Sequence, residues 1–506
     1  MEPANYWLIL LAAYGAVIGS FLNVVVFRLP RGLSVASPRW SFCPACRCSI
    51  RYHDNLPILS WLLLRARCRS CGATISITYP VIECTTVLLF LAVWDAMATV
   101  RLVPGMASVA SDWPVMVAYL VLFAVLLAGS AMDIESYIID IRICLTAVVV
   151  GVVGHGLWWG LAAGPFGAPA SRAATVTPPA LCLIGGAMGA AWLVTHLLVS
   201  CRRGESPNDD KAVSPGGTSV LEDAAPAQPP ASDQPADSAE PVASTTAGPA
   251  DTGRSPSRLW PVVALTVLTL ALLAWQCLAP DQGLAGRLPP GGQRGLVACF
   301  LFMLILVLAS MVSRRADLEI VQEIEAERHS ARRVALGEML LFAPALLVGV
   351  GLFIALRGSV LVSSDWPRAI EHWFGDARWV AFVAGAFHSL AAAALAAGIG
   401  WTVRILGTLA FGKEAFGTGD IYIMGAIGAV GGLPLLVFSF FLAAILALIG
   451  VLVTAFHKSS RAIPFGPWLA LGAFVALWLQ PTLLSLFTPA ASLLWSTLSG
   501  SPTRLH

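Results

Sequence analysis

The sequence predicts an all-α polytopic membrane protein of about 12 transmembrane helices with a small cytoplasmic domain that carries four cysteines. Three observations predict this fold class: an apolar composition, a series of long apolar runs, and a basic, cysteine-rich segment after the first run. Of the 506 residues, 57% are hydrophobic and 12% are charged, whereas soluble domains average roughly 45–50% apolar and 25% charged residues. This composition excludes an ordinary soluble enzyme. The formal net charge is only +2, and we expect no nucleic-acid partner.

The apolar runs have the length that an α-helix needs to cross roughly 30 Å of hydrocarbon, about 20 residues. They start near Tyr6, Val81, Trp113, Ile141, Ala180, Trp260, Gly295, Glu338, Ala377, Ile421, Leu435 and Phe465. The run at Ile421 is short. We expect the first run to stay as an anchor rather than to act as a signal peptide, because Met1 to Tyr6 contains Glu2 and no Lys or Arg.

The basic residues predict the orientation in the membrane. Eight arginines follow the first run: Arg28, Arg31, Arg39, Arg47, Arg51, Arg65, Arg67 and Arg69. The positive-inside bias places this segment in the cytoplasm and the N-terminus outside. If each later run crosses the membrane in the opposite direction to the one before it, Arg202, Lys413 and Arg461 also fall on the cytoplasmic side.

Four cysteines form two C-x-x-C pairs, separated by 21 residues. They are Cys43 and Cys46 in "CPAC", and Cys68 and Cys71 in "CRSC". Four thiolates satisfy tetrahedral Zn²⁺ and leave no position open for a substrate, so the spacing predicts a structural metal site. The alternative is a redox-active or metal-free dithiol pair. Permanent disulfides are not expected in the cytoplasm.

Two carboxylates, Asp133 and Asp420, are placed by the topology at the same membrane depth, each at the cytoplasmic end of a span. Two neighbouring carboxyls can share one proton, so that the ionised one activates a water and the protonated one binds the carbonyl under attack. Gly417 and Gly419 would let a substrate come close to Asp420. The alternative is that Asp420 only caps a helix at the interface.

At this point the residues resemble the type IV prepilin peptidases, which are bacterial inner-membrane aspartyl endopeptidases. The resemblance rests on four ordered blocks: "GAVIGSFLNVVVFRLPRG", the cysteine segment from Cys43 to Glu83, "KEAFGTGD" and "IPFGPWLALG". It implies that Asp133 and Asp420 are the catalytic pair. We expect Gly417, Gly419 and Asp140 to be supporting residues. It also implies cleavage of prepilin or pseudopilin substrates of type IV pilus and type II secretion systems, at the cytoplasmic face, after a glycine and before a hydrophobic helix. Many members also methylate the new N-terminus with S-adenosylmethionine, an activity associated with the cysteine domain.

The sequence departs from the family pattern at three places. Asp140 and Ile141 stand where the family usually has Pro followed by Asp or Asn, and Tyr422 stands where it usually has Lys. Asp140 either compensates as an additional carboxylate or caps the next helix, and capping is favoured. The two aspartates are also 287 positions apart, whereas family members commonly place them within a few tens of residues.

This separation predicts an insertion and a division of the chain into six segments. The segments are 1–27 (first transmembrane helix), 28–80 (cysteine domain), 81–163 (transmembrane helices with Asp133), 164–400 (insertion), 401–482 (transmembrane region with Asp420) and 483–506 (C-terminal tail). Within the insertion we predict further spans, a disordered cytoplasmic linker over 201–258 and a charged helix over 314–337. The insertion could regulate access, bind a partner, or reflect a different substrate.

Two other functions compete with a peptidase. Tyr422 and the insertion favour a catalytically inactive membrane scaffold or assembly factor derived from the same family. A transporter would need more ionisable residues within the spans, and these are scarce. Peptidase and scaffold differ in whether Asp133 and Asp420 lie close together.

Overall fold

The computed structural model describes residues 3–37, 40–103, 106, 108–162, 331–356, 372, 377–455, 464–480 and 483. The predicted spans near Ala180, Trp260 and Gly295, the linker 201–258 and residues 314–330 of the charged helix lie outside these residues. The long described helices are α1 (Pro3–Arg28), α3 (Thr78–Trp94), α4 (Val109–Ser136), α5 (Ile141–Ala162), α10 (Ala331–Leu356), α12 (Ala377–Phe411) and α13 (Thr418–Ala455), followed by an apolar helix at Gly466–Gln480. This part of the chain contains isolated β-bridges but no strand, which confirms the all-α fold class.

Six of the described helices are long and apolar enough to cross a membrane. They correspond to α1, α3 with its π-helical extension (Asp95–Thr99), α4, α5, α12 and α13. Large apolar side chains such as Leu10, Val149 and Ile445 are exposed on their outer faces, as expected of helices that contact lipid. The total of about twelve spans stays a prediction, since much of the chain between α5 and α12 is not described.

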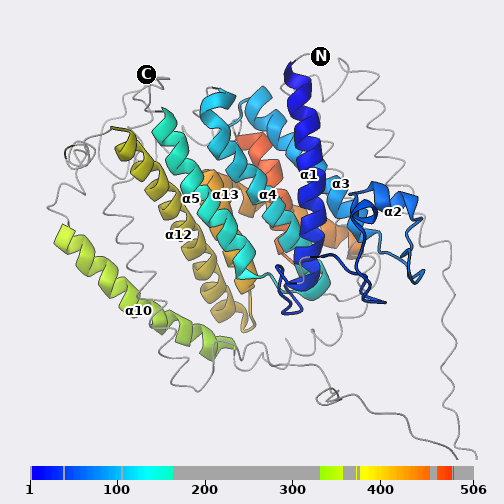
Figure 1. Ribbon diagram of the computed structural model, residues 1–506. Coiled ribbons are helices and arrows are strands. Elements are labelled where there is room, and N and C mark those ends of the chain that lie inside the picture. Colours follow the sequence, from blue (N-terminus) through cyan, green and yellow to red (C-terminus); the bar gives the residue numbers. More distant parts are fainter. Residues whose placement is uncertain are drawn as a thin grey trace, which may run out of the picture.

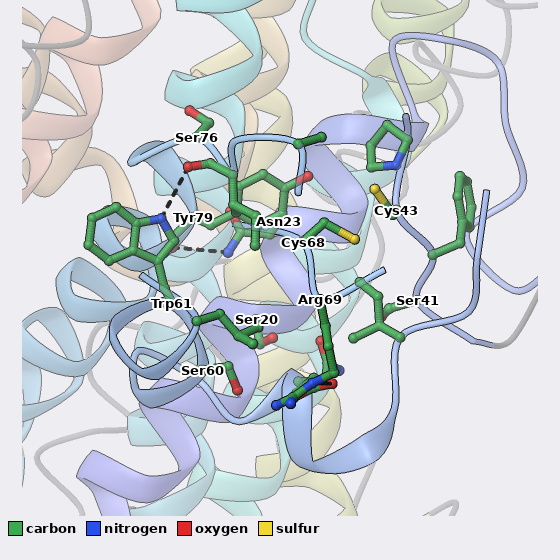
Figure 2. A pocket seen from close by; sticks show the side chains of 18 of the residues that line it. Ser20, Asn23, Ser41, Cys43, Ser60, Trp61, Cys68, Arg69, Ser76 and Tyr79 are labelled. Atoms are coloured by element: carbon green, nitrogen blue, oxygen red, sulfur yellow. Dashed lines mark hydrogen bonds and ion pairs between the residues drawn. The ribbon is translucent and has the colours of Figure 1, made fainter. Parts of the chain in front are cut away.

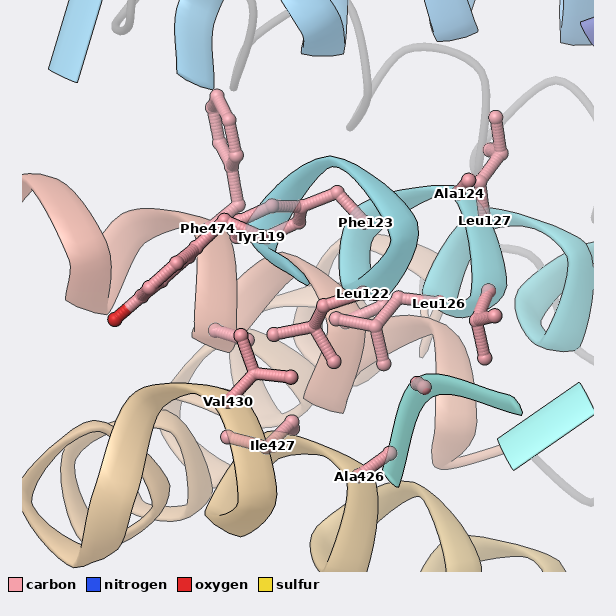
Figure 3. Packing of buried hydrophobic residues seen from close by; sticks show 14 of the residues in the cluster. Tyr119, Leu122, Phe123, Ala124, Leu126, Leu127, Ala426, Ile427, Val430 and Phe474 are labelled. Carbon is pink, nitrogen blue, oxygen red and sulfur yellow. The ribbon is translucent and has the colours of Figure 1, made fainter. Parts of the chain in front are cut away.

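The helix α4 lies at the centre of the bundle, in contact with α1, α3, α5 and α13 (Figure 1). Its side chains Leu122 and Leu126 pack against Ile427 and Val430 of α13, and Phe123 meets Phe474 edge to face with ring centroids 5.4 Å apart (Figure 3). On the other side of the bundle, α12 packs between α5 and α10 (Figure 1). The predicted segment boundary at 400 falls inside α12.

The chain reverses direction within α13, at Gly432. Gly432 has φ 73°, a left-handed conformation that glycine adopts at little cost, and Pro434 begins the next segment. The rings of Phe416 and Phe440 lie 6.2 Å apart, whereas about 36 Å would separate these positions on a straight helix. The element therefore consists of two arms, which match the separate apolar runs predicted at Ile421 and Leu435.

Two polar side chains satisfy the carbonyls that the reversal leaves open. Ser389 Oγ of α12 donates to the Ala429 carbonyl at 2.6 Å, and His155 Nε2 of α5 lies 2.9 Å from the Val430 carbonyl. The last carbonyls of a helix have no partner within it, and an unsatisfied group costs several kcal/mol in lipid. These contacts let the first arm end inside the bundle.

Candidate active site and cysteine cluster

Asp133 and Asp420 are brought to the same end of the bundle by two antiparallel helices. Asp133 lies in the last turn of α4 and is 6% exposed, and Asp420 lies in the first turn of α13 and is 8% exposed. An electrostatic interaction couples the two carboxyl groups. They therefore share one buried environment, although 287 positions separate them in the sequence.

Ile139 fills the space beside both aspartates. It belongs to the short connection between α4 and α5, and it is 8% exposed. A Cβ atom on Gly419 would lie 2.8 Å from Ile139 Cβ, and one on Gly466 would lie 2.7 Å from Asp133 Oδ2. Any larger residue at Gly419 or Gly466 would force these groups apart, so the two glycines allow the close approach.

The two carboxyl groups have few hydrogen-bond donors. Asp133 Oδ2 accepts from the backbone N–H of Gly466 at 3.1 Å, and the backbone of Gly417 donates to Asp420. Asp420 Oδ1 is buried and has no hydrogen-bond partner among the described residues. An unpartnered carboxylate oxygen is costly in a low-dielectric site, and it is available to a water or a substrate.

Arg404 of α12 holds the loop that precedes Asp420. Its Nη1 donates to the Phe416 carbonyl at 2.8 Å and pairs with Glu414, and its Nε lies 3.4 Å from Glu338 of α10. Thr408 Oγ1 accepts from the Ala415 N–H at 3.2 Å. The loop is thus fixed by two side chains of α12, and Arg404 in turn is linked to α10.

An aromatic group lies next to Asp420. Phe416, Phe440 and Phe465 form a triangle with ring centroids 5.5 to 6.2 Å apart. Phe416 precedes the G-x-G-D segment, and Phe465 precedes Gly466. The group gives this side of the site an apolar wall.

Asp140 and Tyr422 are the two predicted departures in this region. The Asp140 carboxylate accepts from the Arg142 N–H at 2.8 Å and pairs with the Arg142 side chain at 2.5 Å, which is a capping arrangement at the start of α5. Tyr422 is half-buried and packs against the apolar core. Neither side chain adds a cation to the aspartate pair.

The four predicted cysteines come together in the segment between α1 and α3. The sulfur atoms of Cys43, Cys46, Cys68 and Cys71 all lie within 4.8 Å of one another. Two turns with the same backbone pattern present them: Cys43 N–H donates to the Cys48 carbonyl at 3.0 Å, and Cys68 N–H donates to the Ala73 carbonyl at 2.8 Å. The C-x-x-C spacing therefore produces one compact four-sulfur cluster.

This cluster fits a zinc ion. Cys43 Sγ and Cys71 Sγ lie 3.9 Å apart and are not joined in a disulfide, and two ligands of tetrahedral Zn²⁺ at about 2.3 Å each are separated by about 3.8 Å. The backbone N–H groups of Cys71 and Ser70 lower the pKa of the Cys68 thiol to about 7, whereas the pKa values of Cys46 and Cys71 in the same cluster are raised. A lowered pKa favours the thiolate, which is the form that binds metal.

Sequence reasoning missed Gly466 and Arg404. The "IPFGPWLALG" block was noticed as part of the resemblance, but nothing in it indicated that the Gly466 N–H reaches Asp133. Arg404 belongs to none of the sequence motifs. The Gly466 contact joins segments 333 positions apart, and the Arg404 contacts depend on how α12 packs against the following loop and α10, so no local pattern could reveal them.

This architecture is that of a helical, multi-pass membrane protein whose N-terminal region is similar to the N-terminal domain of the bacterial A24 peptidases. Residues 13–97 match the family model described as "Bacterial Peptidase A24 N-terminal domain". This match covers the second half of α1, the cysteine cluster and α3.

Among curated proteins, the chain is similar to prepilin leader peptidases. It is 37% identical over 145 residues to the prepilin leader peptidase/N-methyltransferase of Myxococcus xanthus, over 28% of this chain and 39% of the relative. It is 38% identical over 142 residues to the type 4 prepilin-like proteins leader peptide-processing enzyme of Escherichia coli, over 24% of this chain and 46% of the relative. The chain thus spans less than half the length of these two relatives. No significant match exists among solved structures. The predicted resemblance to prepilin peptidases is confirmed.

Proposed function

We propose that this chain is a membrane aspartyl endopeptidase that removes the leader peptide of prepilin-like or pseudopilin proteins. The observation that carries the proposal is the shared burial of Asp133 and Asp420 next to an oxygen, Asp420 Oδ1, that has no partner among the described residues. The names of the relatives supply the substrate class.

The mechanism follows from the pair. Two neighbouring carboxyl groups in a low-dielectric site cannot both ionise at little cost, so they hold one proton between them. The ionised carboxyl removes a proton from a water as the water oxygen attacks the peptide carbonyl carbon, and the protonated carboxyl donates to the carbonyl oxygen. A proton then passes to the amine as the C–N bond breaks. The leader keeps the hydroxyl of the water in its new carboxyl group, the mature protein keeps a hydrogen on its new amine, and the pair again holds one proton.

Each aspartate accepts one backbone hydrogen bond, Asp133 from Gly466 and Asp420 from Gly417. Asp420 Oδ1 has no partner among the described residues, so a proton on this oxygen can be donated to the substrate carbonyl. We assign this hydrogen bond to Asp420 and the removal of the water proton to Asp133. The pair nevertheless titrates as one unit.

Two further activities belong to the cysteine domain. Zn²⁺ held by Cys43, Cys46, Cys68 and Cys71 would stabilise a segment that has little apolar core of its own. Methylation of the new N-terminus, with S-adenosylmethionine as donor, is proposed from the names of the relatives. We place the protein in the bacterial inner membrane with its N-terminus outside and the aspartates at the cytoplasmic face, in agreement with the positive-inside bias.

Cleavage of a prepilin by the full chain in membranes tests the peptidase. Asp133→Asn and Asp420→Asn should each lower cleavage on the order of 100-fold or more, the usual contribution of a general acid or base, with unchanged protein abundance. If both variants cleave at the wild-type rate, the aspartyl mechanism is wrong. If the wild-type chain cleaves no prepilin-like substrate at all, the inactive scaffold becomes the better proposal.

The metal content of the purified protein tests the zinc proposal. Purified protein should contain about one Zn²⁺ per chain by elemental analysis, as expected for a four-cysteine site, and Cys43→Ser with Cys71→Ser should lose it. Cys84→Ser, a cysteine of α3 outside the cluster, is the control and should keep the metal. A metal-free wild-type protein would instead favour the dithiol alternative.

A further inference from the structure

A cavity of about 530 Å³ lies between the cysteine domain and the adjoining ends of α1 and α3. Asn23, Trp61 and Tyr79 surround it, with Cys43 and Cys68 of the sulfur cluster on another side (Figure 2). Its size is within the roughly 300–1,000 Å³ of pockets that bind small molecules. The aspartate pair does not line it, so the peptidase reaction leaves this cavity without a role.

Glu83 of α3 supplies a buried carboxyl group to the cavity wall. It is 7% exposed, and its Oε2 accepts from the Ile58 N–H at 2.6 Å. The side chains of Ser20 and Asn23 also hydrogen-bond to it. Throughout the described ranges, no Lys, Arg or His forms an ion pair with this carboxylate. A buried charge is normally paired, and the open side of Glu83 faces the cavity.

The backbone beside Glu83 is strained. Ile58, whose N–H binds the carboxylate, has φ 63°, which is an outlier for a β-branched residue. Strain of this kind is concentrated at ligand sites and persists only where the surroundings impose it. The hydrogen bond to Glu83 thus fixes the carboxylate and the strained turn together.

The rest of the lining is aromatic and basic. Phe27, Trp61 and Tyr79 provide flat apolar surfaces. Arg69, which forms an ion pair with Asp54 at 2.6 Å, and Arg51 also line the wall. A ligand that fits these walls has a cationic centre, a flat ring and a carboxylate.

We infer that this cavity binds a sulfonium nucleoside methyl donor of the S-adenosylmethionine type, with Glu83 against the cationic centre. The inference rests on the methylation part of the proposed function and adds the site for the donor. In the reaction, the methyl carbon–sulfur bond breaks as a carbon–nitrogen bond forms to a neutral N-terminal amine. The sulfonium becomes a neutral thioether, and the methylated ammonium loses its extra proton to water.

The cavity adjoins the aspartate site through one end of α4. Arg31 of the segment after α1 pairs with Glu135 at 2.8 Å, and Glu135 is two residues from Asp133. Glu135 also interacts electrostatically with Tyr79 on the cavity wall. These contacts link the cavity wall to the end of α4 that carries Asp133.

Binding to the purified full-length protein in detergent tests the inference, with S-adenosylmethionine and S-adenosylhomocysteine as a matched pair of ligands. The second ligand lacks the methyl group and the positive charge. Wild-type protein should bind the sulfonium about 10-fold more tightly or better, the size expected for a contact with a charged group. Glu83→Gln should remove this preference and keep prepilin cleavage within about 2-fold, since Gln can still accept from Ile58. Asp140→Asn, at a carboxylate that pairs with Arg142 outside the cavity, is the control and should keep the preference.

A measurement on unmodified protein covers the case in which Glu83→Gln does not fold. Cys48 is exposed and lines the cavity, so S-adenosylmethionine should slow its alkylation, followed by mass spectrometry. The inference is overturned if Glu83→Gln keeps the ligand preference, or if wild-type protein cleaves prepilin but neither binds the sulfonium nor protects Cys48. Absence of both cleavage and binding in wild-type protein would instead overturn the proposed function.

Discussion

The buried carboxylates at the two ends of the bundle differ in how many hydrogen-bond donors they have. At the end that begins α4, Asp112 is 1% exposed and accepts from three donors: Ser108 N–H at 2.8 Å, Ser111 Oγ at 3.0 Å and Trp158 Nε1 at 2.6 Å. At the other end, Asp133 has one backbone donor and Asp420 Oδ1 has none among the described residues. Since burial is similar, the difference lies in how many donors the fold supplies.

This difference fits a structural role for Asp112 and the chemical role proposed for Asp133 and Asp420. A carboxylate with three donors is stabilised in its ionised form and joins α4 to α5 through Trp158. Two carboxylates with few donors, placed against each other, raise the energy of the folded protein. The proposed aspartyl mechanism requires such a pair, and the following predictions test whether the comparison holds.

The largest effect is expected when the stability of one variant from each end of the bundle is measured. Asp112→Ala should lower the free energy of unfolding by about 1–3 kcal/mol, because Trp158 and Ser108 lose a buried acceptor, while cleavage per folded molecule stays near wild type. Asp420→Asn should leave thermal stability in detergent unchanged or higher, because repulsion with Asp133 is removed. If Asp420→Asn loses as much stability as Asp112→Ala, the proposed difference in role between the two aspartates is wrong.

A smaller effect is expected at Arg404, which positions the loop before Asp420. Arg404→Gln should lower kcat about 10-fold with a smaller change in KM, since the loop contacts the reacting groups only through Asp420. Arg404→Lys should restore part of the rate because it keeps the charge near Glu338 and Glu414. Thr402→Ala, an exposed position on the same helix, is the control. If Arg404→Gln changes abundance but not kcat, Arg404 is only a structural residue.

The smallest effect is expected at Asp140, which pairs with Arg142. Asp140→Ala should keep cleavage within about 2-fold, because an exposed helix cap contributes only about 1 kcal/mol to stability. The rate of prepilin cleavage in membranes is the measurement. A loss as large as that of Asp133→Asn would show that Asp140 belongs to the carboxylate pair after all.

The sequence predicted those features that depend on local patterns. Apolar runs indicated the spans, C-x-x-C spacing indicated the four-sulfur cluster, and alternation of the spans placed Asp133 and Asp420 at the same depth. The two arms of α13 also correspond to a sequence pattern, because separate apolar runs are predicted at Ile421 and Leu435.

Features that depend on the docking of distant segments could not be predicted. The Gly466 N–H and Asp133 are 333 positions apart, and Glu338 and Arg404 belong to different helices. The cavity requires the cysteine segment to lie against α1 and α3, and nothing in the sequence gives that placement. Periodicity and spacing describe one segment at a time, whereas these contacts arise from the packing of several.

The reversal at Gly432 also decides which part of α13 contacts lipid. The first arm, from Thr418 to the residue before Gly432, is only about 21 Å long at 1.5 Å per residue. Its side chains from Ile421 to Val430 are buried, except for half-buried Tyr422. The second arm exposes Phe441, Ile445 and Leu448, so the acyl chains adapt to the second arm, and the short arm that starts beside Asp420 is enclosed by protein.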